Sequence, residues 1–320
     1  FSLSGVFMHV PVLFNEAIEA LSIHPRGTYV DMTLGGAGHA SAILVRLSEG
    51  RLIGFDQDMD AIQRAESTLS SASNAIHLVH ANFSQFKDTL KALQIEAVDG
   101  VLFDLGVSSF HFDEADRGFS YRLDGPLDMR MDASQPLTAN EIVNTYEPRD
   151  LLHILFTYGE ESFARPIVKA IVKARDTKPI ETTSQLVDII KGALPEKRKA
   201  QKGHPAKQTF QALRIAVNDE LGVLERTLSD VLDHLKVGGR CVVISFHSLE
   251  DRLVKTVFKK RSTVDHPADL PTMPTREAPF KLITRKPIIP SAQEMQENPR
   301  SKARRCASLN AFHPVKVILI

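Results

Sequence analysis

The chain has 320 residues, of which 43% are hydrophobic, a length and composition typical of about two folded domains. Its 39 lysines and arginines balance 39 aspartates and glutamates, which excludes long-range attraction of the whole protein to nucleic acid or to an anionic membrane. No apolar run approaches the ~18 residues that a membrane span needs. Cys241 and Cys306 form neither a disulfide framework nor a metal-ligand spacing, so the sequence predicts a cytoplasmic protein without a metal site. Residues 1–8 lack the features of a signal peptide, and Met8 is the expected natural start.

The first third of the chain alternates strands with helices. Short apolar runs predict strands at 28–32, 51–56, 75–79 and 98–104, and periodic apolar residues predict helices between them. The mostly apolar run at 98–104 is typical of a central parallel strand that is buried on both faces. This alternation predicts an α/β fold with a parallel, doubly wound sheet.

The alternation then stops for about a hundred residues. Residues 113–132 are rich in charge and glycine, and residues 137–211 have the pattern of several helices without a strand between them. An inserted all-helical domain accounts for both observations. The expected domains are a first part of the sheet domain at 1–134, the helical insertion at 135–211 and a second part of the sheet domain at 212–320.

The sheet pattern returns in the last third of the chain. A long amphipathic helix is predicted there, with an apolar seam from Leu213 to Leu235 and Gly238-Gly239 at its C-terminal end. Residues 240–246 form the next predicted buried strand. The segments 280–284 and 306–312 are candidates for the last strands, although the prolines near them are typical of loops.

A glycine-rich turn, Gly35-Gly36-Ala37-Gly38, follows the first predicted strand. Such a turn leaves backbone N–H groups and the positive end of a helix facing a ligand, and bulk at Gly36 or Gly38 would block that approach. Asp56 ends the second strand and is placed to accept hydrogen bonds from two ribose hydroxyls, as NAD and S-adenosylmethionine both require. Ser41 replaces the last glycine of the dinucleotide fingerprint, which disfavours a nicotinamide cofactor. The glycines are also compatible with a tight turn that binds nothing.

Asp104 ends the central strand, where an open α/β sheet presents its chemistry. Its carboxylate could accept a hydrogen bond from an exocyclic amine and leave the nitrogen lone pair aimed at a sulfonium methyl, or it could simply cap the next turn. His247 also ends a strand, with structural and functional roles equally open, and Ser248 with Asp251 has the spacing of a capping box. Ser108 and Ser109, in the polar segment after Asp104, and His247 are the weaker catalytic candidates.

Three basic stretches give this neutral chain local positive charge. They lie at 191–207, 255–261 and 300–305, and each is a candidate for phosphate contacts, with a solvated helix face as the alternative. Four aromatic residues follow Asp104 and could stack on an extruded base or pack in the core. They are Phe110, Phe112, Phe119 and Tyr121.

Six blocks stand in order along the chain at 31–39, 104–109, 117–120, 125–132, 204–214 and 245–252. Together they resemble the RsmH/MraW family, the bacterial 16S ribosomal RNA cytosine-N4 methyltransferases, from about His9 to Phe312. The resemblance implies a class I, Rossmann-like S-adenosylmethionine-dependent methyltransferase fold with a helical insertion. It also implies methyl transfer to N4 of a cytosine in the decoding centre, with small-subunit ribosomal RNA or the 30S subunit as the partner.

The same resemblance, carried over residue by residue, implies a set of cofactor contacts. His111 stands where the family has a glutamine, and an imidazole can form a similar hydrogen bond. The C-terminal residues 313–320 have no family counterpart. The expected cofactor-binding residues are Gly36, Ala37, Gly38, His39, Asp56 for the ribose, Phe83 for the adenine, Asp104 and His111.

Two functions from other classes stay open at this point. A nicotinamide-dependent dehydrogenase would share the glycine turn, and a non-catalytic RNA-binding ribosome assembly factor would use the fold as a scaffold only. Cofactor preference distinguishes the first from a methyltransferase, and turnover distinguishes the second. The sequence predicts neither the oligomeric state nor whether a general base is needed, because the proton could leave to water after transfer.

Overall fold

The computed structural model describes residues 11–70, 75–199, 203–263, 278–284, 287–297 and 316–319. These residues form two compact units. One comprises the described residues up to Gly106 and from Gly222 onward, and the other is Val107–Leu221. Within the described part of the chain, no helix is long and apolar enough to cross a membrane. The predictions for Met8, Cys306 and the segments 300–305 and 306–312 concern residues outside these ranges.

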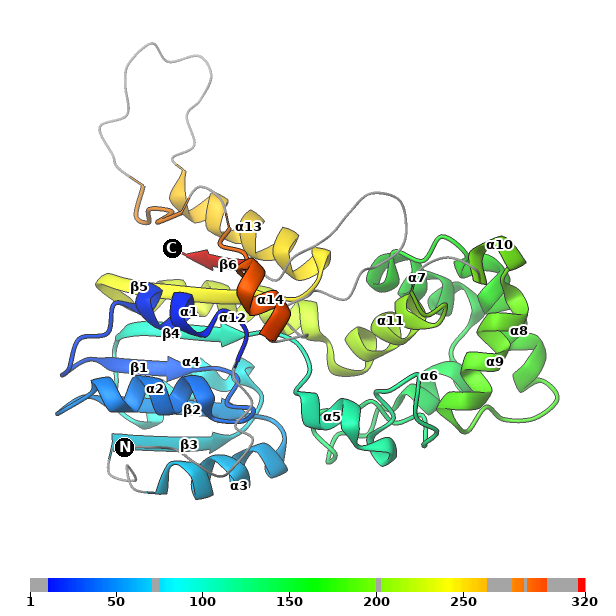
Figure 1. Ribbon diagram of the computed structural model, residues 1–320, viewed down its shortest axis with the longest axis horizontal. Helices are drawn as coiled ribbons and strands as arrows, with labels where there is room; N and C mark the ends of the chain where they lie inside the picture. The colour runs from blue at the N-terminus through cyan, green and yellow to red at the C-terminus, as the bar shows by residue number, and fades with distance from the viewer. Residues whose placement is uncertain are drawn as a thin grey trace, which may run out of the picture. The chain divides into compact units, whose positions relative to one another are not determined.

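The first unit is built on one six-stranded sheet (Figure 1). The strand order is β3-β2-β1-β4-β5-β6, with β1 to β5 parallel and β6 antiparallel to β5. The predicted parallel, doubly wound sheet is therefore confirmed, and its order reverses between β1 and β4, where such folds place their sites. The strands are β1 (Thr28–Asp31), β2 (Arg51–Asp56), β3 (Ile76–His80), β4 (Val98–Asp104), β5 (Leu235–Ser245) and β6 (Lys316–Leu319).

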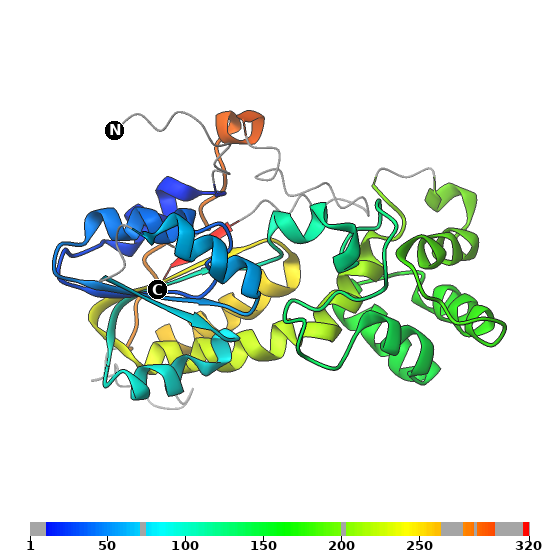
Figure 2. The same cartoon turned by 90° about the horizontal axis from the view of Figure 1, so that it is seen from below.

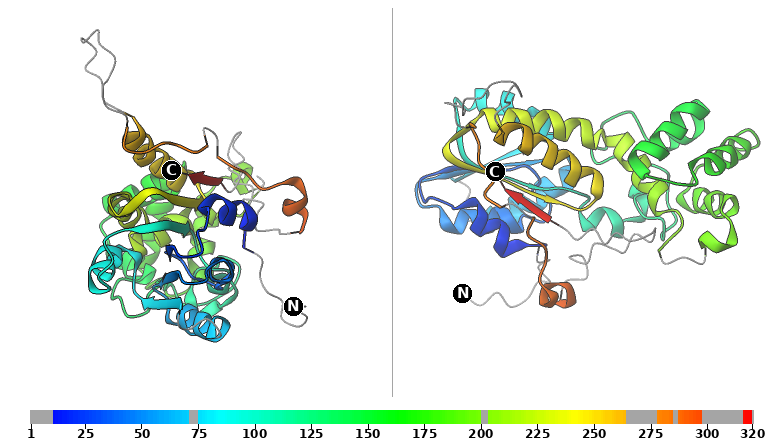
Figure 3. Two further views of the ribbon diagram at one scale, coloured as in Figure 1. Left: turned by 90° about the vertical axis from the view of Figure 1, so that its left-hand side faces the viewer. Right: turned by 90° about the horizontal axis from the view of Figure 1, so that it is seen from above.

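Both faces of this sheet are buried. Successive strand residues point to opposite faces, so neighbouring residues belong to different cores. Tyr29 and Val242 belong to one hydrophobic core, and their neighbours Val30 and Val243 belong to another. Figures 2 and 3 show helices on each face of the sheet. The first core lies under α1 (Phe14–Leu21), α2 (Gly38–Arg46) and α3 (Met59–Thr68), and the second under α4 (Phe86–Ala92), α12 (Glu220–Asp233) and α13 (Ser248–Ser262).

The second unit is helical and has its own core. It begins at Val107, whereas the sequence places the boundary at 134/135, and it ends at Leu221 rather than at 211. Leu127 and Met131 explain the difference, since both are buried in the helical core although their segment has no helical periodicity. The elements are α5 (Ser109–Asp113), η3 (Ala115–Arg117), α6 (Ala139–Thr145), α7 (Pro148–Gly159), α8 (Ala164–Arg175), α9 (Thr183–Ala193), α10 (Glu196–Lys199) and α11 (Lys207–Asn218).

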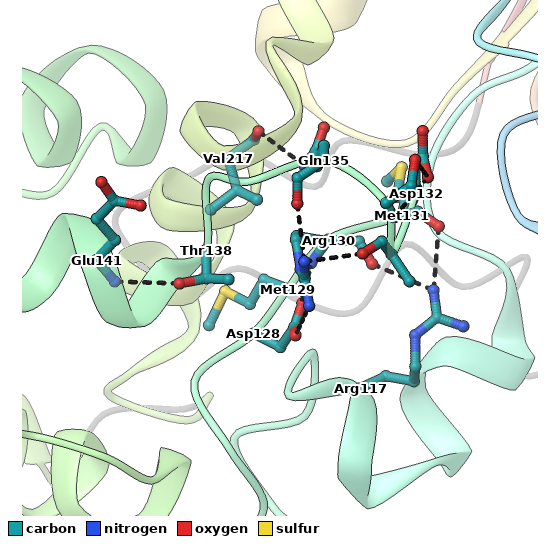
Figure 4. Close-up of polar contacts among 12 residues, drawn as sticks. Arg117, Asp128, Met129, Arg130, Met131, Asp132, Gln135, Thr138, Glu141 and Val217 are labelled. Carbon is teal, nitrogen blue, oxygen red and sulfur yellow. Dashed lines mark hydrogen bonds and ion pairs between the residues drawn. The ribbon is translucent and has the colours of Figure 1, made fainter.

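A hydrogen-bonded loop precedes α6 in this unit (Figure 4). Arg130 forms a bidentate ion pair with Asp128 and donates to the carbonyls of Ala133 and Gln135. Arg117 donates to two further loop carbonyls. Such a dense set of contacts is needed because Met129, at the centre of the loop, is buried in the left-handed region at φ 64°.

The predicted long helix with a seam from Leu213 to Leu235 is wrong as a single element. It is two helices, α11 and α12, which are separated at Asp219, where φ is 45°. The apolar spacing persists through the break, so the sequence pattern does not reveal it. Gly238 and Gly239 also do not end a helix, because both lie inside β5.

The end of the sheet differs from the sequence prediction as well. Residues 280–284 do not form a strand in the structure. The final strand is β6 at 316–319, a short antiparallel edge strand that the apolar run there did not distinguish from a tail. Before it, α14 (Ala292–Glu297) contacts the start of the chain, because Oε1 of Glu294 accepts a hydrogen bond from the Leu13 N–H at 2.7 Å.

Candidate functional site

The glycine turn connects β1 to α2 at the carboxyl edge of the sheet. Gly35 and Ala37 adopt left-handed conformations, with φ 49° and 60°. Ala37 is the N-cap of α2 and provides no side-chain hydrogen bond, which suits the N-terminus of α2 to an anionic or polar ligand group. Gly38 has a packing reason that the sequence did not reveal, because a Cβ there would lie 2.8 Å from Cγ of Pro11. Gly36 lies between Gly35 and Ala37 in the same turn.

Asp56, the last residue of β2, is tied to this turn. Its Oδ2 accepts a hydrogen bond from the Gly35 N–H, and its Oδ1 accepts one from the Asp58 N–H, both at 2.9 Å. These bonds fix the orientation of the carboxylate at the edge of the sheet. The residue predicted to bind ribose is therefore held in place by two backbone groups.

Asp31, the last residue of β1, is an acid that the sequence analysis did not select. It is fully buried, with Oδ1 accepting from the Thr33 N–H at 3.1 Å and Oδ2 without a hydrogen-bond partner among the described residues. Burial raises its pKa well above the ordinary value, and the charges of Asp104 and Asp56 raise it further. The missed signal is that three neighbouring strands, β2, β1 and β4, all end in aspartate.

Asp104, the last residue of β4, contacts His39 from the first turn of α2. Nδ1 of His39 lies 3.5 Å from Oδ2 of Asp104, while Oδ1 of Asp104 has no hydrogen-bond partner in the described part of the chain. The Asp104 N–H donates to Oγ1 of Thr33 at 2.8 Å, which joins the ends of β4 and β1. The His39 ring stacks on Phe14 with a centroid distance of 5.6 Å.

Burial sets the protonation of this pair. It lowers the pKa of His39 to about 4, so the imidazole is neutral at physiological pH. Burial, and then the nearby charge of Glu250, raises the pKa of Asp104 from 3.8 to about 7. The contact therefore joins a neutral ring to a carboxyl that titrates near neutrality, which is a property typical of acid–base groups in active sites.

Glu250 belongs to the N-terminal cap of α13, which differs from the capping box predicted from the sequence. The cap residue is His247 rather than Ser248, and its partner is Glu250 rather than Asp251. Nδ1 of His247 accepts from the Glu250 N–H at 3.4 Å, and Oε2 of Glu250 accepts from the N–H groups of Phe246 and His247 at 2.8 and 3.2 Å. Since Nε2 of His247 also lies 3.2 Å from Oε1 of Glu250, the observed contacts of this histidine are structural.

Phe83 lies in a short 3-10 helix, η2 (Phe83–Gln85), that follows β3. Its ring meets Phe103 of β4 edge to face, with centroids 5.6 Å apart. The residue predicted to contact adenine is thus half-buried and packed against the sheet. It follows β3, which pairs with β2, the strand that ends in Asp56.

The remaining candidates belong to the second unit. Oγ of Ser108 caps α5 by accepting from the Phe110 N–H at 3.4 Å, and Ser109 is the first residue of that helix. His111 is buried and stacks on Phe119, with centroids 4.9 Å apart. The structure brings together the candidates Gly36, Ala37, Gly38, His39, Asp56, Phe83, Asp104 and His247 at one edge of the sheet, and Ser108, Ser109 and His111 in the helical unit.

The sheet order, the glycine turn and the three strand-end acids define a Rossmann-like α/β protein with a polar edge at its switch point. The family model described as the MraW methylase family matches residues 6–312. The chain belongs to that family.

Relatives with assigned names include two proteins called ribosomal RNA small subunit methyltransferase H. One is from Streptococcus dysgalactiae subsp. equisimilis and the other from Streptococcus pyogenes serotype M4. Each is 50% identical over 303 residues, which is 93% of this chain and 96% of the relative. Among solved structures, an rRNA methylase from Streptococcus thermophilus aligns over 99% of this chain and 97% of its own, with 11% identity and a TM-score of 0.39.

Proposed function

We propose that this chain transfers a methyl group from S-adenosylmethionine to N4 of a cytosine in small-subunit (16S) ribosomal RNA. Membership of a methylase family supports methyl transfer, and the names of the relatives that are 50% identical support the acceptor RNA. The choice of N4 of a cytosine follows from the family resemblance of the sequence blocks.

The observation that carries the choice of cofactor is the row of acids at the carboxyl edge. Asp56, Asp31 and Asp104 end three adjacent strands, and the buried Oδ2 of Asp31 has no partner within the described ranges. A row of carboxyls attracts a ligand that carries positive charge and repels a pyrophosphate. S-adenosylmethionine has an ammonium and a sulfonium group, whereas a nicotinamide dinucleotide has a pyrophosphate, so the edge favours the former.

The proposed roles of the edge residues follow from their positions. Asp56 would bind the ribose hydroxyls with its fixed carboxylate, and Phe83 would pack against the adenine. The turn from Gly36 to His39 would contact the cofactor through its backbone, and Asp31 would bind the ammonium group. His111 is proposed to contact the cofactor by its family position.

Asp104 is the proposed catalytic residue. The exocyclic amine of cytosine is a weak nucleophile because its lone pair is delocalised into the ring, so the site must align the amine and supply a hydrogen-bond acceptor for it. When bound, S-adenosylmethionine supplies an electrophilic methyl on its sulfonium. The Asp104 carboxylate can accept a hydrogen bond from N4 and take the proton that N4 loses, because its pKa of about 7 is close to the working pH. Ser108, Ser109 and His247 remain secondary catalytic proposals.

The basic stretches are proposed RNA contacts only in part. In 191–207, Arg198 is buried and Lys199 pairs with Glu196 at 2.7 Å, while Lys197 is exposed. In 255–261, the end residues pair with carboxylates, which leaves the exposed Lys259 and Lys260. The segment 300–305 lies outside the described residues and remains a proposed RNA contact on the basis of its sequence. A cytoplasmic location is part of the same proposal, because that is where bacterial ribosomal subunits are assembled.

Calorimetric titration with S-adenosylmethionine and with NADH tests the cofactor assignment. We expect the first to bind and the second not to bind. Asp31→Asn keeps an acceptor for the Thr33 N–H but cannot ionise to pair with a bound ammonium, so it should weaken S-adenosylmethionine binding at least about tenfold. Asp88→Asn, an exposed acid on α4, is the matched control and should bind normally. Binding of NADH in place of S-adenosylmethionine would overturn the proposal.

A further inference from the structure

An aromatic pair lies among basic side chains in the helical unit. The rings of Tyr121 and His204 are stacked, with centroids 4.4 Å apart and planes 15° from parallel. The buried ring of Phe210 meets Tyr121 edge-on at 5.9 Å and fixes its orientation from the core side. Tyr121 and His204 are both partly exposed, so the pair forms a rigid aromatic feature at the surface of this unit.

Two cations adjoin this pair. The guanidinium of Arg122 lies 5.9 Å from the centroid of the Tyr121 ring, and Lys191 approaches from the last turn of α9. Burial lowers the pKa of His204, and the positive charges of Lys191 and Arg122 lower it further. Within the described ranges, neither cation forms an ion pair with a carboxylate, so their charge is not compensated there.

His204 adds a hydrogen-bond donor to the same place. Its Nδ1 accepts from the Ala206 N–H at 3.3 Å, so the proton of the neutral ring lies on Nε2. Helix α11 begins at Lys207 without a side-chain cap, and its N-terminal dipole adds to the positive potential. Three donors, on Arg122, Lys191 and His204, thus surround an aromatic surface.

We propose that Tyr121, Arg122, Lys191 and His204 form a binding site for the backbone phosphates and an adjacent base of single-stranded RNA. The inference rests on the proposed function, because it takes ribosomal RNA as the acceptor. Cations combined with an aromatic face are typical of sites that bind single strands, where the cations bind phosphates and the ring binds a base. An acidic protein segment would use the cations but not the rings.

The site also revises the RNA contacts expected from the sequence. The basic stretch at 191–207 provides Lys191 and His204, but the central Arg198 is buried, with a hydrogen bond to Gln208 at 3.3 Å. Tyr121 and Arg122 come from a segment about seventy residues earlier, which only the fold brings to the stretch.

Histidine NMR of the full chain provides a local readout. We expect a short single-stranded RNA oligonucleotide to raise the pKa of His204, assigned with the His204→Gln variant, because phosphates offset the two cations. The double variant Arg122→Ala/Lys191→Ala should raise the His204 pKa in the free protein and abolish the response to RNA. The slope of log affinity against log salt should fall by roughly 0.7 for each phosphate that the variant no longer neutralises. Lys87→Ala/Lys91→Ala, which removes two exposed cations of α4 in the other unit, is the control for His204 and should leave its response unchanged.

Two results would overturn the site. One is RNA binding that leaves the His204 pKa and the salt slope of the double variant unchanged. The other is a response of His204 to polyglutamate but not to RNA, which would indicate an acidic protein partner. These measurements do not depend on methyl transfer, so RNA binding at His204 without any transfer would refute only the proposed function, and transfer with an unresponsive His204 would refute only the site.

Discussion

The acid limb of the pH–rate profile depends on two carboxyls, Asp104 and Glu250. Asp104 must be ionised to accept a hydrogen bond and a proton from the amine, and its pKa is about 7. The rate of methyl transfer should therefore fall as pH falls through about 7, with about a tenth of Asp104 ionised at pH 6. Glu250→Gln removes the second cause of this raised pKa while keeping an oxygen to accept from the Phe246 and His247 N–H groups.

The size of the effect follows from the order of the two causes. Burial is the larger cause of the rise from 3.8 to about 7, so Glu250 accounts for less than half of it. Lowering the Asp104 pKa by about one unit would raise its ionised fraction at about pH 6 from roughly a tenth to roughly a half. Each rate is divided by the rate of the same protein on its alkaline plateau. This normalised rate should be about fivefold higher in Glu250→Gln than in the wild type at about pH 6, and equal in the two proteins at about pH 8.

Single-turnover rates with small subunits and S-adenosylmethionine well below saturation report the pKa of the free protein, without a contribution from product release. The matched control is Glu49→Gln, which removes an exposed carboxylate, paired with Arg26, just before β2 at the opposite edge of the sheet. It should leave the acid limb unmoved. An acid limb at the same pH in Glu250→Gln, or a rate that does not depend on pH across neutrality, would refute the role assigned to the Asp104 carboxylate.

Three further predictions concern single residues. Asp104→Asn should reduce the single-turnover rate at least about a hundredfold while leaving the circular dichroism spectrum unchanged, and wild-type activity would remove Asp104 from the mechanism. Because the folded-state pKa of Asp31 is raised, wild-type stability should fall as pH rises above the ordinary range of an aspartate; Asp31→Asn should lose that slope in denaturant titrations, and an unchanged slope would contradict the burial argument. Asn218→Ala should destabilise the protein by about 2–4 kcal/mol, because the side chain bonds two backbone groups of the loop in Figure 4 at 2.8 Å, and a loss below about 0.5 kcal/mol would contradict this.

The sheet was predictable because its signals are local. Apolar runs at 51–56 and 98–104 gave both strands with the bounds that the structure has. Strands that alternate with helices indicate a parallel sheet, and the rules for connecting such strands leave few topologies. Asp56 and Asp104 could be selected for the same reason, since each is the last residue of such a run.

Other features depend on tertiary contacts that leave no local pattern. The left-handed Asp219 ends a helix although the apolar spacing in the sequence continues past it. Arg198 has the sequence context of an exposed cation although it is buried. The capping box needs a histidine at the N-cap, a residue that is not preferred there, so Ser248 was the natural choice from sequence alone. Asp31 was missed because its importance lies in the neighbouring acids rather than in its own segment.

The central claim is transfer of a methyl group to N4 of a ribosomal cytosine, and nucleoside analysis after labelling tests it most directly. The chain is incubated with radiolabelled S-adenosylmethionine and small ribosomal subunits from a strain that lacks the endogenous enzyme. The ribosomal RNA is then digested and its nucleosides are separated. Label in N4-methylcytidine is the predicted result, and its loss in Asp104→Asn would connect it to the site. Label in a different nucleoside, or no label with subunits that the native enzyme modifies, would contradict the claim.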